Sequence, residues 1–238
     1  MIDKLLYLQY NCEGMDNVFG AIAADVIDST SLSRTDLRRL SDEVSRCFAD
    51  AKYYTPTRFW GRLVKGDSIE CCLPDPSMTL RLAMLLKCRI KSWAGDLVCS
   101  EALQDLGIRF SIGIGRMRIV DPQMDIMDGE AIYMAGRNLN KIAGTSATSA
   151  FGLAAENRTI TDVIDISIAL LDDLVNSLSA KQSEVIYYML LGLNQTEIAR
   201  QLLISQSSVN SRAQKAGWRL ISHTMHVYER INFKDYVG

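Results

Sequence analysis

The chain has 238 residues, of which 48% are hydrophobic and 23% charged, and its formal net charge at pH 7 is −2. This composition is typical of a folded protein of one large domain or two ordinary ones, and it excludes a disordered chain. No apolar run approaches the roughly 20 residues that span a bilayer, and the first residues lack a signal-peptide pattern. We therefore expect a cytoplasmic protein.

Six cysteines lie in the first half of the chain, and none forms a CxxC pair. Two of them are adjacent within an apolar, strand-like run. Reduced and buried thiols are therefore favoured over a metal or redox site. The six are Cys12, Cys47, Cys71, Cys72, Cys88 and Cys99.

The first half alternates between strand and helix patterns. Residues 18–28 form an apolar run of strand length that ends in two carboxylates, Asp25 and Asp28. Residues 29–51 have helical spacing, with Ser31 or Ser33 as the N-cap. Two short strands follow, joined by a tight turn with Gly66 at its centre. These two strands are at 58–64 and 68–73. A helix at 76–93, a strand at 108–115 and a helix that is opened by Asp128 or Gly129 and closed by Gly144 follow.

The order of these elements predicts a ferredoxin-like plan, in which an antiparallel sheet carries its helices on one face. Residues 145–160 are small and polar, and they fit either an edge hairpin or a linker. From Ile160 onward the pattern is helical. The sequence thus predicts an α+β protein, with a sheet domain over residues 1–157 and an all-helical domain over 158–238.

Two short helices are predicted back to back near the C-terminus. The first spans 195–202 with Asn194 as its cap, and the second begins after the Ser205 cap and runs to about Leu220. A leucine, Leu203, lies in the turn between them, and a positive φ there would cost about 1 kcal/mol. The residues expected to be buried are Ile198, Ala199, Leu202, Ile204, Val209, Ala213 and Leu220.

This pattern resembles the helix-turn-helix of bacterial transcription factors, especially LuxR-type regulators and sigma-factor region four. The outward face of the second helix has side chains that can read base edges in a major groove, and Gln195 and Thr196 can contact backbone phosphate. The alternative is a helical hairpin with a merely solvated polar face. The predicted reading residues are Gln206, Ser207, Ser208, Asn210, Ser211, Arg212 and Lys215.

Charge is distributed unevenly along the chain. Between Ser179 and Ile221, five basic residues stand against two acidic ones, so this segment carries +3 and the rest of the chain carries −5. A locally basic module on an acidic remainder fits site-specific contact with double-stranded DNA better than diffuse binding.

Residues 18–145 resemble class III nucleotide cyclases and, more closely, the related SatD-family proteins. The resemblance rests on DVIDST at the end of the first strand, the GDSIE hairpin, the RFSIGIG strand and the helix GEAIYMAGRNL. It implies that Asp25 and Asp67 bind a metal such as Mg²⁺ and that Arg137 contacts the phosphates of a nucleotide.

The sequence departs from the cyclase pattern at three positions. Tyr133 stands where cyclases have an asparagine that contacts the transition state, and Leu63 stands where they hold a purine-reading lysine. Asp28 replaces a common glycine. We therefore expect the cyclase turnover to be lost, while binding of a metal or nucleotide stays open, as does the reading in which the carboxylates only cap strand ends.

Two functions are consistent with these observations. The first is a homodimeric transcription regulator, in which the cyclase-like domain senses a ligand or dimerises head to tail and the C-terminal module binds operator DNA. The second is a metal-dependent enzyme acting on a nucleotide, with the helical module as a partner-binding appendage. The operator, the ligand, and the choice between activation and repression are not determined by the sequence.

Overall fold

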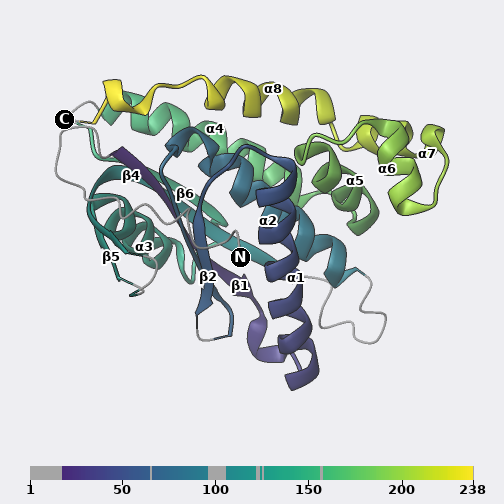
Figure 1. Cartoon of the computed structure of the whole chain (residues 1–238), viewed down its shortest axis with the longest axis horizontal. Helices are drawn as coiled ribbons and strands as arrows, with labels where there is room; N and C mark the ends of the chain where they lie inside the picture. Colours follow the sequence, from purple (N-terminus) through teal and green to yellow (C-terminus); the bar gives the residue numbers. More distant parts are fainter. Residues whose placement is uncertain are drawn as a thin grey trace, which may run out of the picture.

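The computed structural model describes residues 18–64, 66–95, 106–121, 124, 126–155 and 158–237. Its architecture is α+β, as predicted: a sheet lies on one side of helix α2 (Thr79–Ala94), and the C-terminal helices lie on the other (Figure 1).

Six strands form one sheet in the order β2-β3-β1-β4-β5, and β6 also pairs with β4. All pairs are antiparallel except β4 with β6. The edge of β4 that faces away from β1 pairs with β6 along Phe110–Ile114 and with β5 along Met117–Asp121. The strands are β1 (Val18–Ile27), β2 (Trp60–Val64), β3 (Ser68–Leu73), β4 (Gly107–Asp121), β5 (Ile126–Gly129) and β6 (Ser149–Leu153).

The predicted strands are confirmed, and a tight turn in which Gly66 has a φ of 91° joins β2 to β3. Residues 145–160, for which the sequence allowed an edge hairpin or a linker, contribute a parallel edge strand, β6. The segment is therefore neither a hairpin nor only a linker. The prediction missed β5, because this strand has only 4 residues and merges directly into the next helix.

Helices cover both faces of the sheet. Ile22 of β1 belongs to the core beneath α1 (Arg34–Tyr54) and α2, whereas its neighbour Ala21 points to the opposite face. There it packs with Ala131 and Ala135 of α3 (Glu130–Ile142). The prediction that all helices lie on one face is therefore wrong.

Glycines in β4 explain the position of α3. A β-carbon at Gly113 would lie 2.2 Å from the carbonyl oxygen of Ala131 and 2.6 Å from the amide nitrogen of Ala135. Gly115 has similarly close neighbours on the same helix. The alternation of isoleucine and glycine in this strand therefore gives one apolar face and one face that a helix backbone can approach directly.

Ser33 is the N-cap of α1, and its hydroxyl oxygen accepts a hydrogen bond from the Asp36 amide at 3.2 Å. This settles the choice between Ser31 and Ser33 as the N-cap. Leu32 precedes the cap and is buried outside the helix. The second helix follows a single 3₁₀ turn over Pro76–Met78, close to the predicted start.

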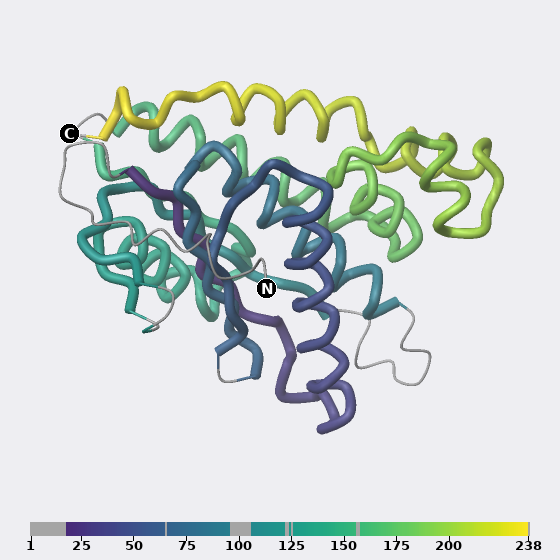
Figure 2. Tube along the Cα trace, viewed as in Figure 1, coloured from purple at the N-terminus to yellow at the C-terminus, as the bar shows by residue number. Residues whose placement is uncertain are grey.

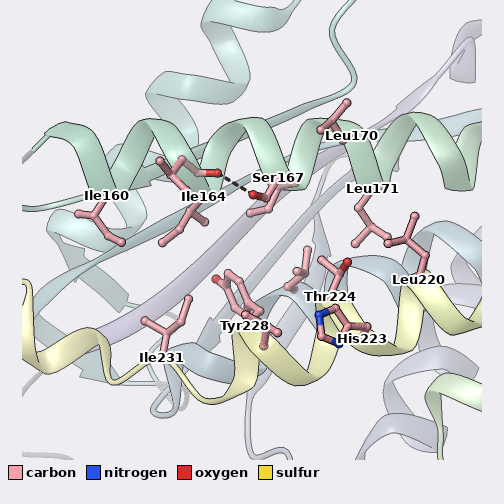
Figure 3. Close-up of a pocket in the computed structure, with 14 residues that line it drawn as sticks. Ile160, Ile164, Ser167, Leu170, Leu171, Leu220, His223, Thr224, Tyr228 and Ile231 are labelled. Carbon is pink, nitrogen blue, oxygen red and sulfur yellow. Dashed lines mark hydrogen bonds between the residues drawn. The ribbon is translucent and has the colours of Figure 1, made fainter.

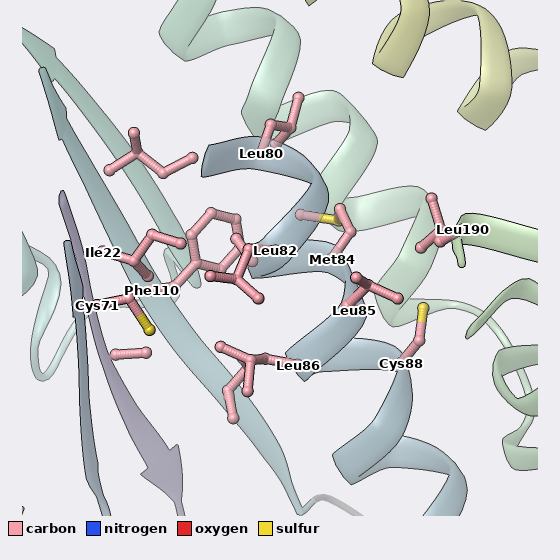
Figure 4. Close-up of a cluster of buried hydrophobic side chains, with 14 of the residues drawn as sticks. Ile22, Cys71, Leu80, Leu82, Met84, Leu85, Leu86, Cys88, Phe110 and Leu190 are labelled. Carbon is pink, nitrogen blue, oxygen red and sulfur yellow. The ribbon is translucent and has the colours of Figure 1, made fainter. Parts of the chain in front are cut away.

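Helix α2 forms the centre of the hydrophobic core. Figure 4 shows Ile22, Cys71 and Phe110 of the sheet on one side of α2 and Leu190 on the other. One core therefore continues from the sheet into the C-terminal helices, across the predicted boundary between residues 157 and 158. These helices are α4 (Arg158–Asn176), α5 (Ala180–Leu190), α6 (Gln195–Leu202), α7 (Gln206–Lys215) and α8 (Trp218–Glu229).

Polar contacts also join α2 to the C-terminal helices. Lys87 of α2 forms an ion pair with Asp172 of α4, and both side chains are only 2% exposed. Thr79 shares a buried hydrogen bond of 2.8 Å with the hydroxyl of Tyr228, and Arg81 donates to Glu229 at 2.5 Å. The C-terminal helices are thus held to α2 by directional contacts as well as by apolar packing.

Four cysteines, Cys47, Cys71, Cys72 and Cys88, are buried free thiols, as predicted, whereas Cys12 and Cys99 lie outside the described residues. Burial raises the pKa of the Cys88 thiol to about 12, which makes it unreactive at neutral pH. Within the described residues, no helix has the length and apolar character needed to cross a membrane.

Candidate nucleic-acid interface and carboxylate site

The predicted pair of short helices is present, and local hydrogen bonds define where each begins. The side-chain oxygen of Asn194 accepts from the amides of Thr196 and Glu197, each at 3.0 Å, and the Glu197 carboxylate accepts from the Asn194 amide at 2.8 Å. Ser205 caps α7 by accepting from the Ser208 amide at 3.2 Å. These caps satisfy amides that the first turn of a helix leaves unpaired.

A small apolar core holds the two helices against α5. It consists of Val185, Ile198, Val209 and Ala213, all at most 3% exposed. The other residues expected in this core, Ala199, Leu202 and Ile204, pack around it and are partly buried. Helices α6 and α7 thus pack against each other through most of the residues that the sequence predicted to be buried.

The turn between the helices contains backbone strain. Leu203 has a φ of 54° and a ψ of 41°, and its side chain is 92% exposed. The amide of the next residue, Ile204, donates to the carbonyl of Ala199 at 3.1 Å and closes α6. Because a β-carbon disfavours the left-handed region, this leucine costs about 1 kcal/mol, and no apolar burial offsets the cost.

The second helix is shorter than predicted. It ends at Lys215, and Gly217, with a φ of 71°, separates it from α8. Leu220 therefore lies on α8 and is 58% exposed, so the expectation that it faces inward is wrong. A glycine just past the last turn is a common helix terminator, and this signal was present in the sequence.

Most of the predicted reading residues lie on the exposed side of α7. Gln206, Ser207, Asn210, Ser211 and Lys215 are exposed, and Ser208 is partly exposed. Thr196 is exposed at the start of α6, where Gln195 donates from its amide nitrogen to the Asn210 carbonyl oxygen at 3.3 Å. This contact joins the N-terminus of α6 to the centre of α7.

Arg212 has a different position from the other reading residues. Its guanidinium lies 3.9 Å from the carboxylate of Glu184 on α5, and its side chain is only 28% exposed. The structure thus places Arg212 at the edge of the α7 face, partly turned toward α5.

The predicted carboxylates lie at one end of the sheet. The Asp25 carboxylate is 3.4 Å from the guanidinium of Arg109 on the neighbouring strand. Asp67 lies in the β2–β3 turn and accepts from the Ser29 hydroxyl at 2.7 Å. Burial raises the pKa of Asp25, Arg109 lowers it, and the negative charge of Asp67 raises it. Two carboxylates from distant parts of the chain are therefore brought together at this end of the sheet.

Several buried polar atoms around Asp25 have no hydrogen-bond partner among the described residues. They are Oδ1 of Asp25, Nε of Arg109 and Oγ of Ser111, and register places all three on the α3 side of the sheet. Strand alternation in residues 108–115 would have placed Arg109 and Ser111 together on one face, but sequence analysis did not single them out. Asp28 has a φ of 58°, which an aspartate tolerates better than most residues.

These residues fit a metal ion only weakly. The described residues contain no group of three or more histidine, cysteine or acidic side chains that could surround an ion. Asp25 and Asp67 supply two carboxylates, but Arg109 already places a positive charge beside one of them. Tight binding of Mg²⁺ would require further oxygen ligands, such as those of a phosphate.

Arg137, the predicted phosphate contact, lies on α3. Its guanidinium lies over the ring of Tyr133, 6.0 Å from the ring centroid, in a hollow of about 350 Å³ that contains neither Asp25 nor Asp67. The Tyr133 hydroxyl donates to Asp128, a hydrogen bond that raises the pKa of the tyrosine and lowers that of the carboxyl. The predicted phosphate contact of Arg137 and the predicted metal pair thus stay predictions.

Comparison with known proteins identifies the C-terminal part. Residues 168–220 match the family model of sigma-70, region 4. The chain thus carries a helix-turn-helix of the sigma-70 region 4 type. The match begins within α4 and ends within α8, so this region 4 segment includes all three helices of the small apolar core.

Among solved structures, two similar chains are described as structures of a bacterial light-regulated adenylyl cyclase. They share 14% and 13% sequence identity with this chain, with TM-scores of 0.41 and 0.42. Each alignment covers 56% of this chain and 42% of the other, so this chain spans less than half of their length. No curated protein matches.

Proposed function

We propose that this protein is a DNA-binding transcription regulator, in which the sheet domain holds the helix-turn-helix in place. The observation that carries the proposal is the α7 face: amide and hydroxyl side chains are exposed along a helix whose opposite side is buried against α5 and α6. Asparagine and glutamine can each form two hydrogen bonds to adenine, and serine can contact phosphates. The region 4 match supports the same conclusion.

The N-terminus of α6 contributes contacts of a second kind. Thr196 is exposed at a helix N-terminus, where its hydroxyl can contact a phosphate and the helix dipole favours an anion. The local excess of positive charge, with Lys215 exposed at the end of α7, favours approach to a polyanion. We therefore assign phosphate contact to α6 and base contact to α7.

Helix α5 connects the sheet domain to the helix-turn-helix. Val185 on one side of α5 belongs to the small core with α6 and α7, whereas Ile186 and Leu190 pack into the main core around α2. The hydroxyl of Tyr187 donates to Asp50 of α1 at 2.7 Å. These contacts therefore fix the orientation of the helix-turn-helix relative to the sheet domain. In the function that we propose, the sheet domain is a cyclase-like scaffold that has lost turnover and that senses a ligand.

The first test is selection of random duplex DNA on the purified full-length protein at about 0.15 M salt, where purely electrostatic binding is weak. We expect an enriched motif with twofold symmetry. Absence of enrichment, with and without Mg²⁺ and nucleotides, would contradict the proposal and assign the helical module to protein contacts.

A substitution in α7 tests the assignment of base contact. Asn210→Ala is expected to weaken binding of the selected duplex by about 1–3 kcal/mol and to relax the preference at one base pair. Fluorescence anisotropy across single-base variants of the duplex measures both effects. Gln201→Ala, an exposed glutamine on α6, is the matched control and should leave affinity unchanged. An equal loss on all sequences with a shallower salt dependence would reassign Asn210 to phosphate contact.

The unpartnered atoms of Asp25, Arg109 and Ser111 favour one second candidate, a phosphate-bearing nucleotide held at the carboxylate site with Mg²⁺. Arg109 would contact the phosphate, and Asp25 and Asp67 would hold the ion. Isothermal titration of ATP and GTP with Mg²⁺ tests this, together with turnover of both nucleotides. Binding that is lost in Asp25→Ala without turnover supports a sensor, whereas turnover lost in the same variant supports an enzyme.

A further inference from the structure

An apolar strip lies along the outer surface of α4 and α8, the two longest C-terminal helices. The helices run in opposite directions, so that Ile160 lies across from Ile231 and Leu171 across from Leu220, with a groove of about 440 Å³ between them (Figure 3). Five large apolar side chains of the strip are between 40% and 69% exposed. They are Val163, Ile166 and Leu170 of α4 and Leu220 and Val227 of α8.

Opposite charges flank this strip on its two long sides. Asp162 and Asp173 are exposed on α4, on the same side of the helix as Ile166. Arg219 on α8 and Arg230 at its C-terminal cap are exposed on the far side of α8. Within the described ranges, none of these four takes part in an ion pair. Arg158, the first residue of α4, lies one turn before Asp162, outside the span of the two aspartates.

The two charged pairs have the same spacing. Asp162 and Asp173 are eleven residues apart, as are Arg219 and Arg230, which corresponds to three helical turns or about 16.5 Å. Because the helices are antiparallel, Asp173 and Arg219 are both at the end near α5, and Asp162 and Arg230 are both at the other end. The acidic and basic flanks therefore match in length and in position.

We propose that a second copy of this chain binds this strip through a twofold axis parallel to α4 and α8. Such an axis places the acidic flank of one copy against the basic flank of the other, so that Asp173 meets Arg219 and Asp162 meets Arg230. A twofold axis across the helices would instead bring acid against acid. The contact thus has an apolar centre and a polar rim, and each residue pair occurs twice.

The same axis also fits DNA recognition, in an argument that rests on the proposed function. The helix-turn-helix lies at one end of the α4–α8 layer, where α4 leads into α5 and α8 follows α7 (Figure 2). An axis along the helices brings both copies of α7 to the same end of the dimer, where one duplex can reach both. An axis across the helices would place them at opposite ends.

The test is the oligomeric state of the full chain in the absence of DNA, measured by sedimentation over a wide range of concentration. The wild type is expected to dimerise, and Leu170→Glu to raise the dimer dissociation constant about 100-fold, because it buries an unpaired charge. Leu170 is exposed in the single chain, so its fold should be retained, which circular dichroism checks. A wild-type monomer, or a dimer that Leu170→Glu does not weaken, would overturn the proposal.

A charge exchange tests the axis itself. Asp173→Arg and Arg219→Asp are each expected to raise the dissociation constant about tenfold, and the double variant to restore it, since the attraction is re-formed with its sign reversed. Asp42→Arg, an exposed aspartate on α1, makes the same charge change elsewhere and should have no effect. Absence of rescue in the double variant would overturn this arrangement of the two copies.

DNA binding separates this proposal from the one on which its second argument rests. A protein that dimerises through this strip but enriches no DNA retains the interface and contradicts the regulator. A protein that binds DNA but remains monomeric supports DNA binding by the helix-turn-helix and contradicts the interface.

Discussion

The helix-turn-helix and the carboxylate site differ in the sequence distance between the residues that interact in them. In the former, Asn194 and Ser205 cap their helices through residues two or three positions away. In the latter, Asp25 and Arg109 are brought together from positions 84 residues apart, and polar atoms on both remain unpartnered among the described residues.

This difference indicates separate roles for the two regions. A reader of DNA benefits from a rigid surface whose shape is complete before the ligand arrives, because ordering it on binding would cost free energy. A site with buried, unpartnered polar atoms is incomplete until a ligand supplies the missing contacts. The comparison is therefore consistent with the proposed function, in which the C-terminal end recognises DNA and the sheet domain senses a ligand.

The largest expected effect concerns the buried ion pair between Lys87 of α2 and Asp172 of α4. Lys87→Met leaves the Asp172 carboxylate buried without its cation, so we expect the free energy of unfolding to fall by about 3–5 kcal/mol. Urea denaturation measures it. Lys87→Met combined with Asp172→Leu should recover most of the loss, and Lys141→Met, at an exposed lysine, should change stability by less than about 0.5 kcal/mol. A small effect of Lys87→Met alone would show that the link depends on apolar packing instead.

A substitution in the turn of the helix-turn-helix is expected to increase stability. Leu203→Gly relieves the left-handed conformation of an exposed leucine, and we expect about 0.5–1 kcal/mol of stabilisation after the greater freedom of glycine in the unfolded chain is subtracted. Thermal unfolding measures the change. Arg200→Gly, in the exposed interior of α6, is the control and should destabilise by about 1 kcal/mol. A loss of stability in Leu203→Gly would mean that the leucine side chain has a stabilising contact.

The smallest effect is expected at the carboxylate site, and it depends on pH. Burial raises the pKa of Asp25 above 3.8, so the stability linked to its protonation is complete below that value and is lost as the pH rises through the folded-state pKa. At neutral pH, Asp25→Asn should therefore stabilise the protein, by less than about 1 kcal/mol because Arg109 and partial exposure offset the burial cost.

Denaturation at pH 7 and at pH 3.5 checks this prediction, and the difference between Asp25→Asn and wild type should vanish at the lower pH. Asp42→Asn, at an exposed position, should show no difference at either pH. Destabilisation by Asp25→Asn at pH 7 would mean that the Arg109 ion pair outweighs the cost of burial, and that the carboxylate is structurally satisfied.

The sequence by itself determined the elements whose signals are local. Asn194 and Ser205 set where the two short helices begin, and alternation and turn residues predicted the strands and the β2–β3 turn. Such features depend on hydrogen bonds and backbone preferences within a few residues, so they can be read from short segments. Gly217 was an equally local signal for the end of α7, and it was overlooked.

Only the tertiary structure decided how distant segments meet. The placement of α3 on the second face depends on its close approach to Gly113, and the pairing of Asp25 with Arg109 depends on the register of β1 against β4. These arrangements result from many weak contacts between segments far apart in the chain, and no short stretch of sequence contains them.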